Sequence, residues 1–327
     1  MGGAKVVYVV GFGRSGSTLL GNLLGSIDGF FSVGELHMIW RALIRDTGCG
    51  CGERVSRCDV WSTVVEDVSS HPAWPGSADA ASLLARAEAS VVRTRSIRAA
   101  AADDRRLSSG LRRYADLLGA LYEAIGRVTG ARVVVDSSKT PADAATLRLL
   151  PGIDQYLVHL VRDPRAVAYS QGRRQPTLDA HRSGEMHRRG IAESSARWVV
   201  VNRLADDLRR DVGPDRSTLL RYEDMIDRPV PVVRRIVRLT GEAGDSIPFA
   251  DERTAILRPS HTVWGNRSRF AHGRVHLRPD EEWKQQRPVA RAAVTLMTLP
   301  WLHAYGYRIT SRQPDPEPER RKDSSRS

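Results

Sequence analysis

Two short segments of the chain carry residue types suited to holding phosphate groups. In the first, residues 11–18, glycine, arginine, serine and threonine follow an apolar run at 6–10 and precede leucine-periodic residues. Glycines let backbone N–H groups approach an anion, and a helix that starts there turns its unpaired N–H groups toward it. The pattern predicts a phosphate-binding loop between a strand and a helix.

Two common nucleotide motifs overlap in this loop. Gly11-x-Gly13-x-x-Gly16 fits the dinucleotide-binding fingerprint, with Glu35 at about the distance expected for its acidic residue. A Rossmann-type NAD(P)-dependent oxidoreductase is therefore one alternative. The loop also nearly fits a Walker A motif, but Ser17 stands at the lysine position. Without that lysine the β- and γ-phosphates lose their main cation, which disfavours a kinase or an ATPase.

The second segment is Arg162-Asp-Pro-Arg-Ala-Val-Ala-Tyr-Ser170, directly after the apolar residues 156–161. Pro164 suits the first turn of a helix. An arginine at a strand end makes charge-assisted bonds to phosphate, each worth about 1.5–3 kcal/mol. The structural alternative is an Arg–Asp pair that caps the helix.

Both segments resemble motifs of sulfotransferases that use 3′-phosphoadenosine 5′-phosphosulfate (PAPS). Arg14-Ser-Gly-Ser-Thr-Leu-Leu resembles their 5′-phosphosulfate loop, and Arg162 with Ser170 resembles their 3′-phosphate motif. The oxidoreductase alternative does not explain the second motif. The resemblance implies PAPS as cosubstrate, 3′-phosphoadenosine 5′-phosphate (PAP) as product and no required metal. It assigns nucleotide binding to Gly13, Arg14, Ser15, Gly16, Ser17, Thr18, Arg162 and Ser170.

Sulfuryl transfer to a hydroxyl needs a base and cations. Glu35, after a short apolar run, resembles the Gly-Glu glutamate base of bacterial carbohydrate and tyrosylprotein sulfotransferases. That role requires burial to raise the pKa of the carboxyl group. His37 is the rival base, because its ordinary pKa suits proton transfer. His159, in the middle of a predicted strand, is expected to be a core residue.

The resemblance also suggests the cations and the adenine contact. Arg14 stands in place of the loop lysine of cytosolic members, and Lys139 resembles a strand-end lysine that faces the sulfuryl group. Tyr222 resembles a tyrosine that lies against adenine. Arg267 and Arg269 are candidates for the 3′-phosphate, although the Arg-Lys-Gly loop of cytosolic members is absent. These departures indicate the carbohydrate, tyrosylprotein and bacterial branch, and leave a sugar, a glycolipid, a secondary metabolite or a peptide hydroxyl as acceptor.

The elements that would position these residues alternate between strands and helices. Strands are expected at 6–10, 132–136, 155–161 and 217–222, with 30–33 as a short fifth. This order predicts an α/β, P-loop-NTPase-like three-layer domain with a central parallel sheet of about five strands. Helices are expected at 192–212 and 282–307.

The domain should span residues 1–311, with a disordered tail at 312–327. The pattern of residues 80–130 predicts an inserted helical layer that shapes the acceptor pocket.

The net charge of +12 would attract an anionic cosubstrate, and no nucleic-acid motif accompanies it. We find no signal peptide and no apolar run long enough for a transmembrane helix, so we expect a cytoplasmic enzyme. Its partner would be a small-molecule, glycan or lipid acceptor, and no motif indicates an oligomeric state.

The three cysteines are grouped as Cys49-x-Cys51-x6-Cys58. They could begin a zinc site with His37 or His71 as fourth ligand, but Cys-x-Cys is not a usual finger spacing. Their odd number disfavours a disulfide framework. We predict reduced thiols in a glycine-rich surface turn and no metal.

Overall fold

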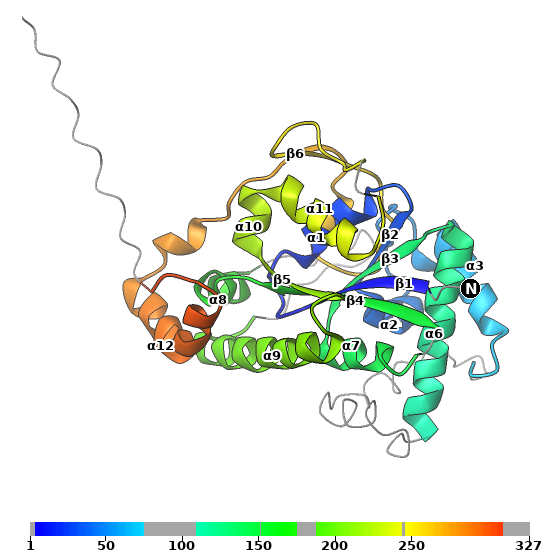
Figure 1. Ribbon diagram of the computed structural model, residues 1–327, viewed down its shortest axis with the longest axis horizontal. Coiled ribbons are helices and arrows are strands. Elements are labelled where there is room, and N and C mark those ends of the chain that lie inside the picture. The colour runs from blue at the N-terminus through cyan, green and yellow to red at the C-terminus, as the bar shows by residue number, and fades with distance from the viewer. Residues whose placement is uncertain (1–3, 75–108, 151, 175–187, 244–245, 310–327) are drawn as a thin grey trace, which may run out of the picture.

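The computed structural model describes residues 4–74, 109–150, 152–174, 188–243 and 246–309. A five-stranded sheet lies at its centre, with strand order β2-β3-β1-β4-β5 (Figure 1). All neighbouring strands in this sheet are parallel. The strands are β1 (Ala4–Val10), β2 (Phe30–Gly34), β3 (Val133–Lys139), β4 (Ile153–Val161) and β5 (Ser217–Arg221).

The valine-rich sequence of β1 explains its place in the middle of the sheet, because a strand buried on both faces needs apolar side chains in both directions. Val6, Tyr8 and Val10 pack into one core, and Val7 and Val9 pack into the other. Each face of the sheet is therefore covered by its own helical layer (Figure 1).

On one side of the sheet lie helices α1 (Ser17–Gly25), α10 (Tyr222–Asp227) and α11 (Pro229–Leu239) (Figure 1). On the other side lie α2 (Ile39–Arg45), α3 (Asp59–Ser69), α6 (Ser109–Thr129), α7 (Pro141–Leu147) and α9 (Ile191–Val212). Helices α8 (Pro164–Gly172) and α12 (Pro288–Ala304) pack on α9 beyond the edge of the sheet. The described chain also contains short 3₁₀ turns and a separate antiparallel strand pair. The turns are η1 (Leu36–Met38), η2 (Val55–Arg57), η4 (Arg267–Phe270) and η5 (Glu282–Gln285), and the strands are β6 (Thr254–Leu257) and β7 (Gly273–His276).

The register of the sheet brings its functional loops together. Val10, the last residue of β1, lies opposite Lys139 on β3 and His159 on β4. Since the strands are parallel and end at nearly the same level, the loops that follow them meet at one edge. Ligands bind at this carboxyl edge in open α/β sheets.

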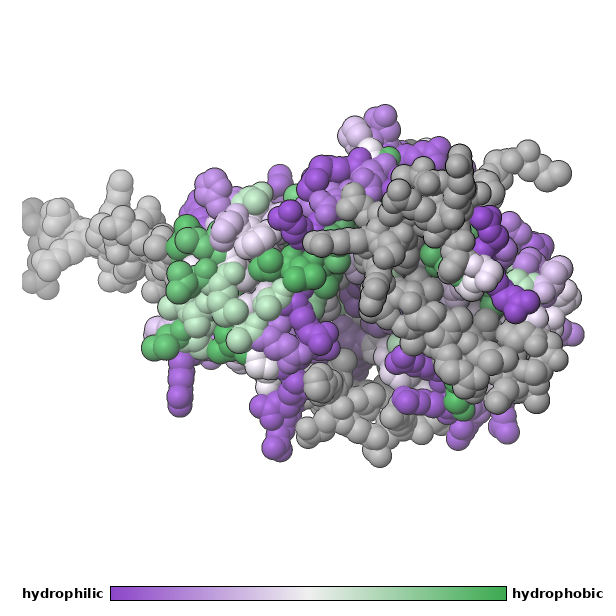
Figure 2. Space-filling view, turned by 90° about the horizontal axis from the view of Figure 1, so that it is seen from below, coloured by the Kyte–Doolittle hydropathy of each residue, from purple (hydrophilic) through white to green (hydrophobic). Residues whose placement is uncertain are grey.

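Exposed apolar side chains gather where α9 and α12 reach the surface, and Figure 2 shows them as a continuous apolar area on that face. They include Val200, Val289, Leu296 and Met297. Among the described residues, no helix combines the length and apolar composition needed to cross a membrane.

The predicted α/β fold with a parallel sheet of five strands is confirmed. Tyr222 is not the last residue of a strand as expected, since it begins α10, and residues 282–307 form a 3₁₀ turn followed by α12. Of the predicted helical insertion, α6 lies within the described residues and packs on α3, β1 and β3. Residues 80–108 and the tail at 312–327 lie outside them, so the acceptor-pocket role of the insertion stays a prediction.

The loop after β1 offers a matched pair of glycine substitutions. Gly11 has φ 147°, and a Cβ atom there would lie 2.3 Å from the Leu160 carbonyl oxygen. Gly13 has no such strain, and its Cβ would make an ordinary 3.6 Å contact with Gln171. We expect Gly11→Ala to lower the free energy of unfolding by about 2 kcal/mol or more and Gly13→Ala by under about 1 kcal/mol. Urea unfolding measures both, and equal losses would contradict the packing argument.

Candidate active site

The loop after β1 leaves the first turn of α1 open to an anion. Gly16 is the N-cap of α1 with φ 88°, and no side chain of the described residues caps the helix. The Ser15 hydroxyl donates to the Phe12 carbonyl at 2.6 Å and so braces the loop itself. The leading N–H groups of α1 and the positive end of its dipole therefore face the carboxyl edge of the sheet.

Arg162, at the end of β4, connects the two phosphate motifs. Its Nη1 donates to the Arg14 carbonyl oxygen at 3.1 Å. Its guanidinium stacks on the ring of Tyr222 at 4.3 Å, and a Cβ atom on Gly16 would lie 2.5 Å from the same ring. Trp198 Nε1 donates a hydrogen bond to the Arg162 carbonyl oxygen and so fixes the backbone of Arg162. Segments almost 150 residues apart in sequence thus form one surface.

The same guanidinium already holds an internal anion. Arg162 Nη2 donates to Asp280 Oδ2 at 2.9 Å, while the buried Nε has no hydrogen-bond partner among the described residues. Both side chains line a cavity of about 270 Å³ beside Tyr222 and Trp283. Ser170, on α8, is half-buried and makes no hydrogen bond to Arg162 in the described part of the chain. The Asp280 carboxylate thus already occupies one donor of the guanidinium that the prediction assigns to a phosphate.

Glu35 and Lys139 form an ion pair at the ends of β2 and β3. Lys139 Nζ donates to Glu35 Oε1 at 2.7 Å and to the Ser137 carbonyl at 3.0 Å. The two side chains are only 18% and 16% exposed, so water screens the pair weakly. Lys139 and Arg14 both have φ 72°, a strained conformation for residues other than glycine. Each predicted catalytic cation is thus held in an uncommon backbone conformation.

The charges around Glu35 set its protonation. Burial, the largest single effect, raises the pKa of its carboxyl group, but Lys139, His37 and Arg269 together lower it more, leaving the pKa below its ordinary value. The pKa of Glu35 is therefore lowered, whereas the role of a general base calls for a raised pKa. In the described state Glu35 is an ionised carboxylate neutralised by Lys139.

His37, two residues further, is a neutral imidazole. Burial is the main cause that lowers its pKa to about 4, with Lys139 acting in the same direction and Glu35 against it. Its Nδ1 is buried and has no hydrogen-bond partner among the described residues. The imidazole therefore carries no charge at neutral pH, but its lowered pKa makes it a weaker base than an ordinary histidine. His159, by contrast, is a fully buried core residue whose Nε2 lies 3.1 Å from Asn202 Oδ1, as expected.

Further cations surround the ion pair. Burial lowers the pKa of Arg14, and the neighbouring charges of Arg162 and Arg173 lower it further while Glu35 raises it. Arg269 is buried close enough to Glu35 to affect its pKa, whereas Arg267 is exposed. The structure therefore places Arg269 near Glu35, and its predicted role at the 3′-phosphate stays a prediction.

A buried polar network behind Lys139 was not predicted. Tyr122 of α6 donates to Asp136 Oδ2 at 2.5 Å, and the Ser138 amide donates to Asp136 Oδ1 at 2.7 Å. Tyr8 donates to the Thr140 carbonyl, and Thr140 bonds to Asp143, whose pKa is raised to about 7 mainly by burial. The sequence signal was an aspartate inside an apolar strand, since such a group needs buried partners.

The chain belongs to the sulfotransferase family, because the model of the "Sulfotransferase family" matches residues 7–245. A mouse protein, carbohydrate sulfotransferase 5, is 33% identical over 102 residues, which cover 28% of this chain and 26% of the mouse protein. The chain thus matches about a quarter of that relative's length.

Two solved bacterial sulfotransferase domains share the fold. The domain of the Synechococcus PCC 7002 olefin synthase has TM-score 0.50 and 22% identity, covering 94% of this chain and 96% of the domain. The domain from the curacin biosynthetic pathway has TM-score 0.51 and 18% identity, covering 95% and 99%. A Rossmann-type oxidoreductase is therefore set aside.

The low pKa of His37 predicts a pH-dependent stability. In the unfolded chain histidine binds a proton near pH 6.5, but folded His37 does so only near pH 4. Between these values the unfolded state binds more protons, so the free energy of unfolding falls as pH falls, by up to about 1.4 kcal/mol per pH unit. Urea unfolding from pH 7 to pH 4.5 should show a smaller fall for His37→Gln than for wild type. Exposed His272→Gln is the control, and equal slopes for wild type and His37→Gln would contradict the assignment.

Proposed function

We propose that the chain transfers the sulfuryl group of PAPS to a hydroxyl of an acceptor molecule. The proposal rests on one observation: Arg162 contacts the Arg14 carbonyl and the Tyr222 ring, and so joins the two motifs. In PAPS-dependent enzymes these motifs bind the 5′-phosphosulfate and the 3′-phosphate of PAPS. A nucleotide with phosphates at 5′ and 3′ positions matches two anion sites on neighbouring strands.

The residues present suit such a nucleotide. The uncapped first turn of α1 offers N–H donors for the 5′-phosphosulfate, and Arg14 adds a positive charge from inside the loop. Arg162 offers its guanidinium to the 3′-phosphate, and its unpartnered Nε shows that its donors are not all used within the described chain. The Tyr222 ring lies near both Gly16 and Arg162, so we assign the adenine contact to this side chain.

The chemical step moves one sulfuryl group and one proton. The acceptor oxygen forms a bond to sulfur as the bond from sulfur to the 5′-phosphate oxygen breaks, and PAP leaves with that electron pair. We assign the acceptor's proton to Glu35 and the growing negative charge on the leaving phosphate to Arg14 and Lys139. Such a reaction depends mainly on positioning and on fixed charges.

The ion pair between Glu35 and Lys139 gives these two residues a shared role. While Lys139 is paired, the Glu35 carboxylate is ionised and weakly basic. A sulfuryl group beside Lys139 would draw the ammonium away from the carboxylate, which would raise the proton affinity of Glu35 as the acceptor hydroxyl arrives. The lowered pKa of the Glu35 carboxyl group then describes the enzyme before PAPS and the acceptor bind.

The acceptor is a molecule with a hydroxyl group. The similarity to a carbohydrate sulfotransferase favours a sugar or a glycolipid, and a secondary metabolite or a peptide hydroxyl fits the same chemistry. The proposal includes a cytoplasmic location. Its first test is calorimetry with PAP, NAD, NADP and ATP, in which PAP alone should bind at micromolar or lower Kd. Binding of NADP in preference to PAP would overturn the proposal.

Arg162 and Asp280 should change PAP binding in opposite directions. Arg162→Ala leaves the 3′-phosphate unpaired and should weaken binding by about 2–5 kcal/mol. Asp280→Asn removes the competing carboxylate and should tighten binding up to about fivefold, the scale of a half-exposed ion pair. Arg235→Ala, at an exposed arginine of α11, is the charge-matched control. Calorimetry at fixed salt measures all three, and wild-type affinity in Arg162→Ala would refute the phosphate assignment.

Glu35→Gln separates the two candidate bases. Glutamine keeps the shape of the side chain but does not take up the proton, so kcat should fall by about 10²–10⁴ while PAP binding persists. His37→Ala should lower kcat less. The rate is measured as PAP formed with the acceptor present. The reverse ranking of the two variants would make His37 the base.

Lys139→Met tests the cation. It keeps most of the alkyl stem and removes the charge, so kcat should fall about a hundredfold, the scale of losing one oxyanion donor. PAP affinity should change much less, because the charge matters most as the sulfuryl group leaves. Lys5→Ala, at the amino end of β1, is the control. A normal kcat in Lys139→Met would leave that residue a structural role alone.

A further inference from the structure

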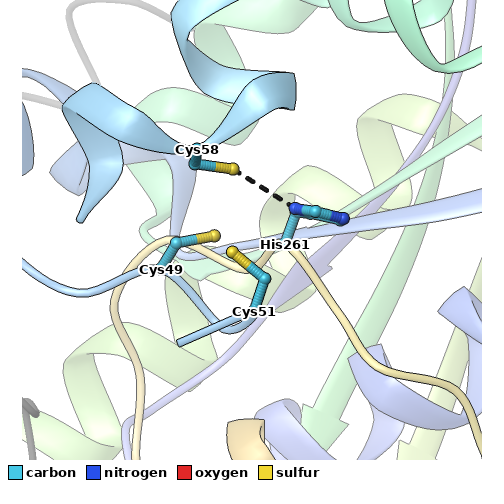
Figure 3. A group of neighbouring side chains, drawn as sticks. All are labelled: Cys49, Cys51, Cys58 and His261. Carbon is cyan, nitrogen blue, oxygen red and sulfur yellow. Dashed lines mark hydrogen bonds between the residues drawn. The ribbon is translucent and has the colours of Figure 1, made fainter. Parts of the chain in front are cut away.

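Four side chains of types that can bind a metal ion meet in a cluster that contains none of the residues assigned to the nucleotide. Cys49 and Cys51 lie in the turn after α2, Cys58 precedes α3, and His261 lies in the segment between β6 and η4 (Figure 3). The three Sγ atoms and a ring nitrogen of His261 all lie within 4.8 Å of one another. His261 Nδ1 is 3.2 Å from Cys58 Sγ.

We propose that these four side chains bind one structural zinc ion. Zinc bonds are about 2.3 Å to sulfur and 2.0–2.1 Å to nitrogen, so the ligand atoms of a tetrahedral site with three sulfurs and one nitrogen stand roughly 3.6–3.8 Å apart. The four ligand atoms lie within 4.8 Å of one another, with Cys58 Sγ and His261 Nδ1 at 3.2 Å, so small side-chain movements bring them to this size. Three thiolates and one imidazole are a usual ligand set of structural zinc. Because four protein ligands leave no open position, the ion would be structural and not catalytic.

The backbone holds the ligands in place without a metal. The Cys49 amide donates to the Glu53 carbonyl and the Gly52 amide to the Cys49 carbonyl, which forms a tight turn. At Gly50 a Cβ atom would lie 2.6 Å from Ser260 Oγ, so only glycine lets the two segments approach this closely. A preformed site of this kind reduces the entropy that metal binding must overcome.

His261 is fixed from two sides. Its carbonyl accepts a hydrogen bond from Trp61 Nε1 at 2.6 Å, and its ring stacks on Phe31 with centroids 6.3 Å apart. These contacts turn Nδ1 toward the thiols, as Figure 3 shows. The side chain therefore has the orientation of a ligand before any ion binds.

The cluster joins two segments that reach the candidate active site. Next to His261, Val263 accepts a hydrogen bond from the Glu35 amide and donates to the Val33 carbonyl. The same segment leads to Arg269, which lies beside Glu35. A zinc ion would thus anchor the segment that supports the carboxylate and its neighbouring cation, which is a positioning role.

The structure revises what the cysteine spacing suggested. Cys49 and Cys58 are buried, so the expected surface turn is wrong for both. Neither His37 nor His71 belongs to the cluster, because the fourth ligand comes from His261, more than 200 residues after Cys58.

The first experiment measures metal and thiols in the full chain. After expression in zinc-containing medium and gel filtration, elemental analysis should find one zinc per chain. The three thiols should react slowly with a thiol reagent and become reactive when a chelator removes the zinc. Absence of zinc, or a disulfide between two of the three cysteines, would overturn the proposal.

Variants test the ligand set. His261→Ala and Cys51→Ser should retain less than about a tenth of the zinc, whereas His272→Ala, an exposed histidine outside the cluster, should retain all of it. His261→Cys keeps four ligands and should restore zinc binding. Full zinc in His261→Ala would overturn the ligand assignment even if that variant folds poorly.

Cobalt substitution gives a readout that does not depend on activity. In the wild-type chain cobalt should show the visible bands of a tetrahedral site and sulfur-to-cobalt charge-transfer bands, and the charge-transfer bands should weaken in Cys51→Ser. An octahedral cobalt spectrum would refute the site. Because metal content and spectra are measured without nucleotide, their result is independent of whether PAP binds.

Discussion

The close approach of β1 to β4 is the constraint on which the candidate site depends. Gly11 leaves β1 so near the Leu160 carbonyl that no side chain fits between them. This contact brings the turn of the phosphate loop beside the end of β4, so that Arg162 reaches the Arg14 carbonyl. A wider separation of the two strands would take Arg162 out of reach of the loop.

The cations at this edge are held by groups of the protein itself. Glu35 neutralises Lys139, and Asp280 neutralises Arg162, so neither charge is buried without a partner. An unpaired buried charge is expensive, and these carboxylates let the fold keep its cations in place before a ligand arrives. Behind them, the bonds of Asp136 to Tyr122 and Ser138 fix the end of β3, where Lys139 adopts its strained backbone. Lys139 and Arg162 are thus both neutralised by carboxylates of the described chain.

Elements marked by a local sequence pattern could be predicted from the sequence. Contacts between residues far apart in the sequence could not. Apolar runs with glycine-rich turns indicated the strands and both phosphate motifs, because these signals are local. The Asp280 partner of Arg162 comes from a loop without a regular pattern, and the lowered pKa of Glu35 arises from Lys139 and Arg269, each from another element. His261 could not be assigned to the cysteines, since nothing near it in sequence marks it as a ligand.

The separation between Cys58 and His261 also sets an order in time. The two residues lie 203 positions apart, so a ribosome that adds 5–20 residues per second makes the thiols roughly 10–40 s before the histidine. During that interval the nascent chain carries three neighbouring cysteines and none of the later segment that completes the cluster. An early disulfide among these thiols would remove ligands of the proposed zinc site before the segment that carries His261 is made.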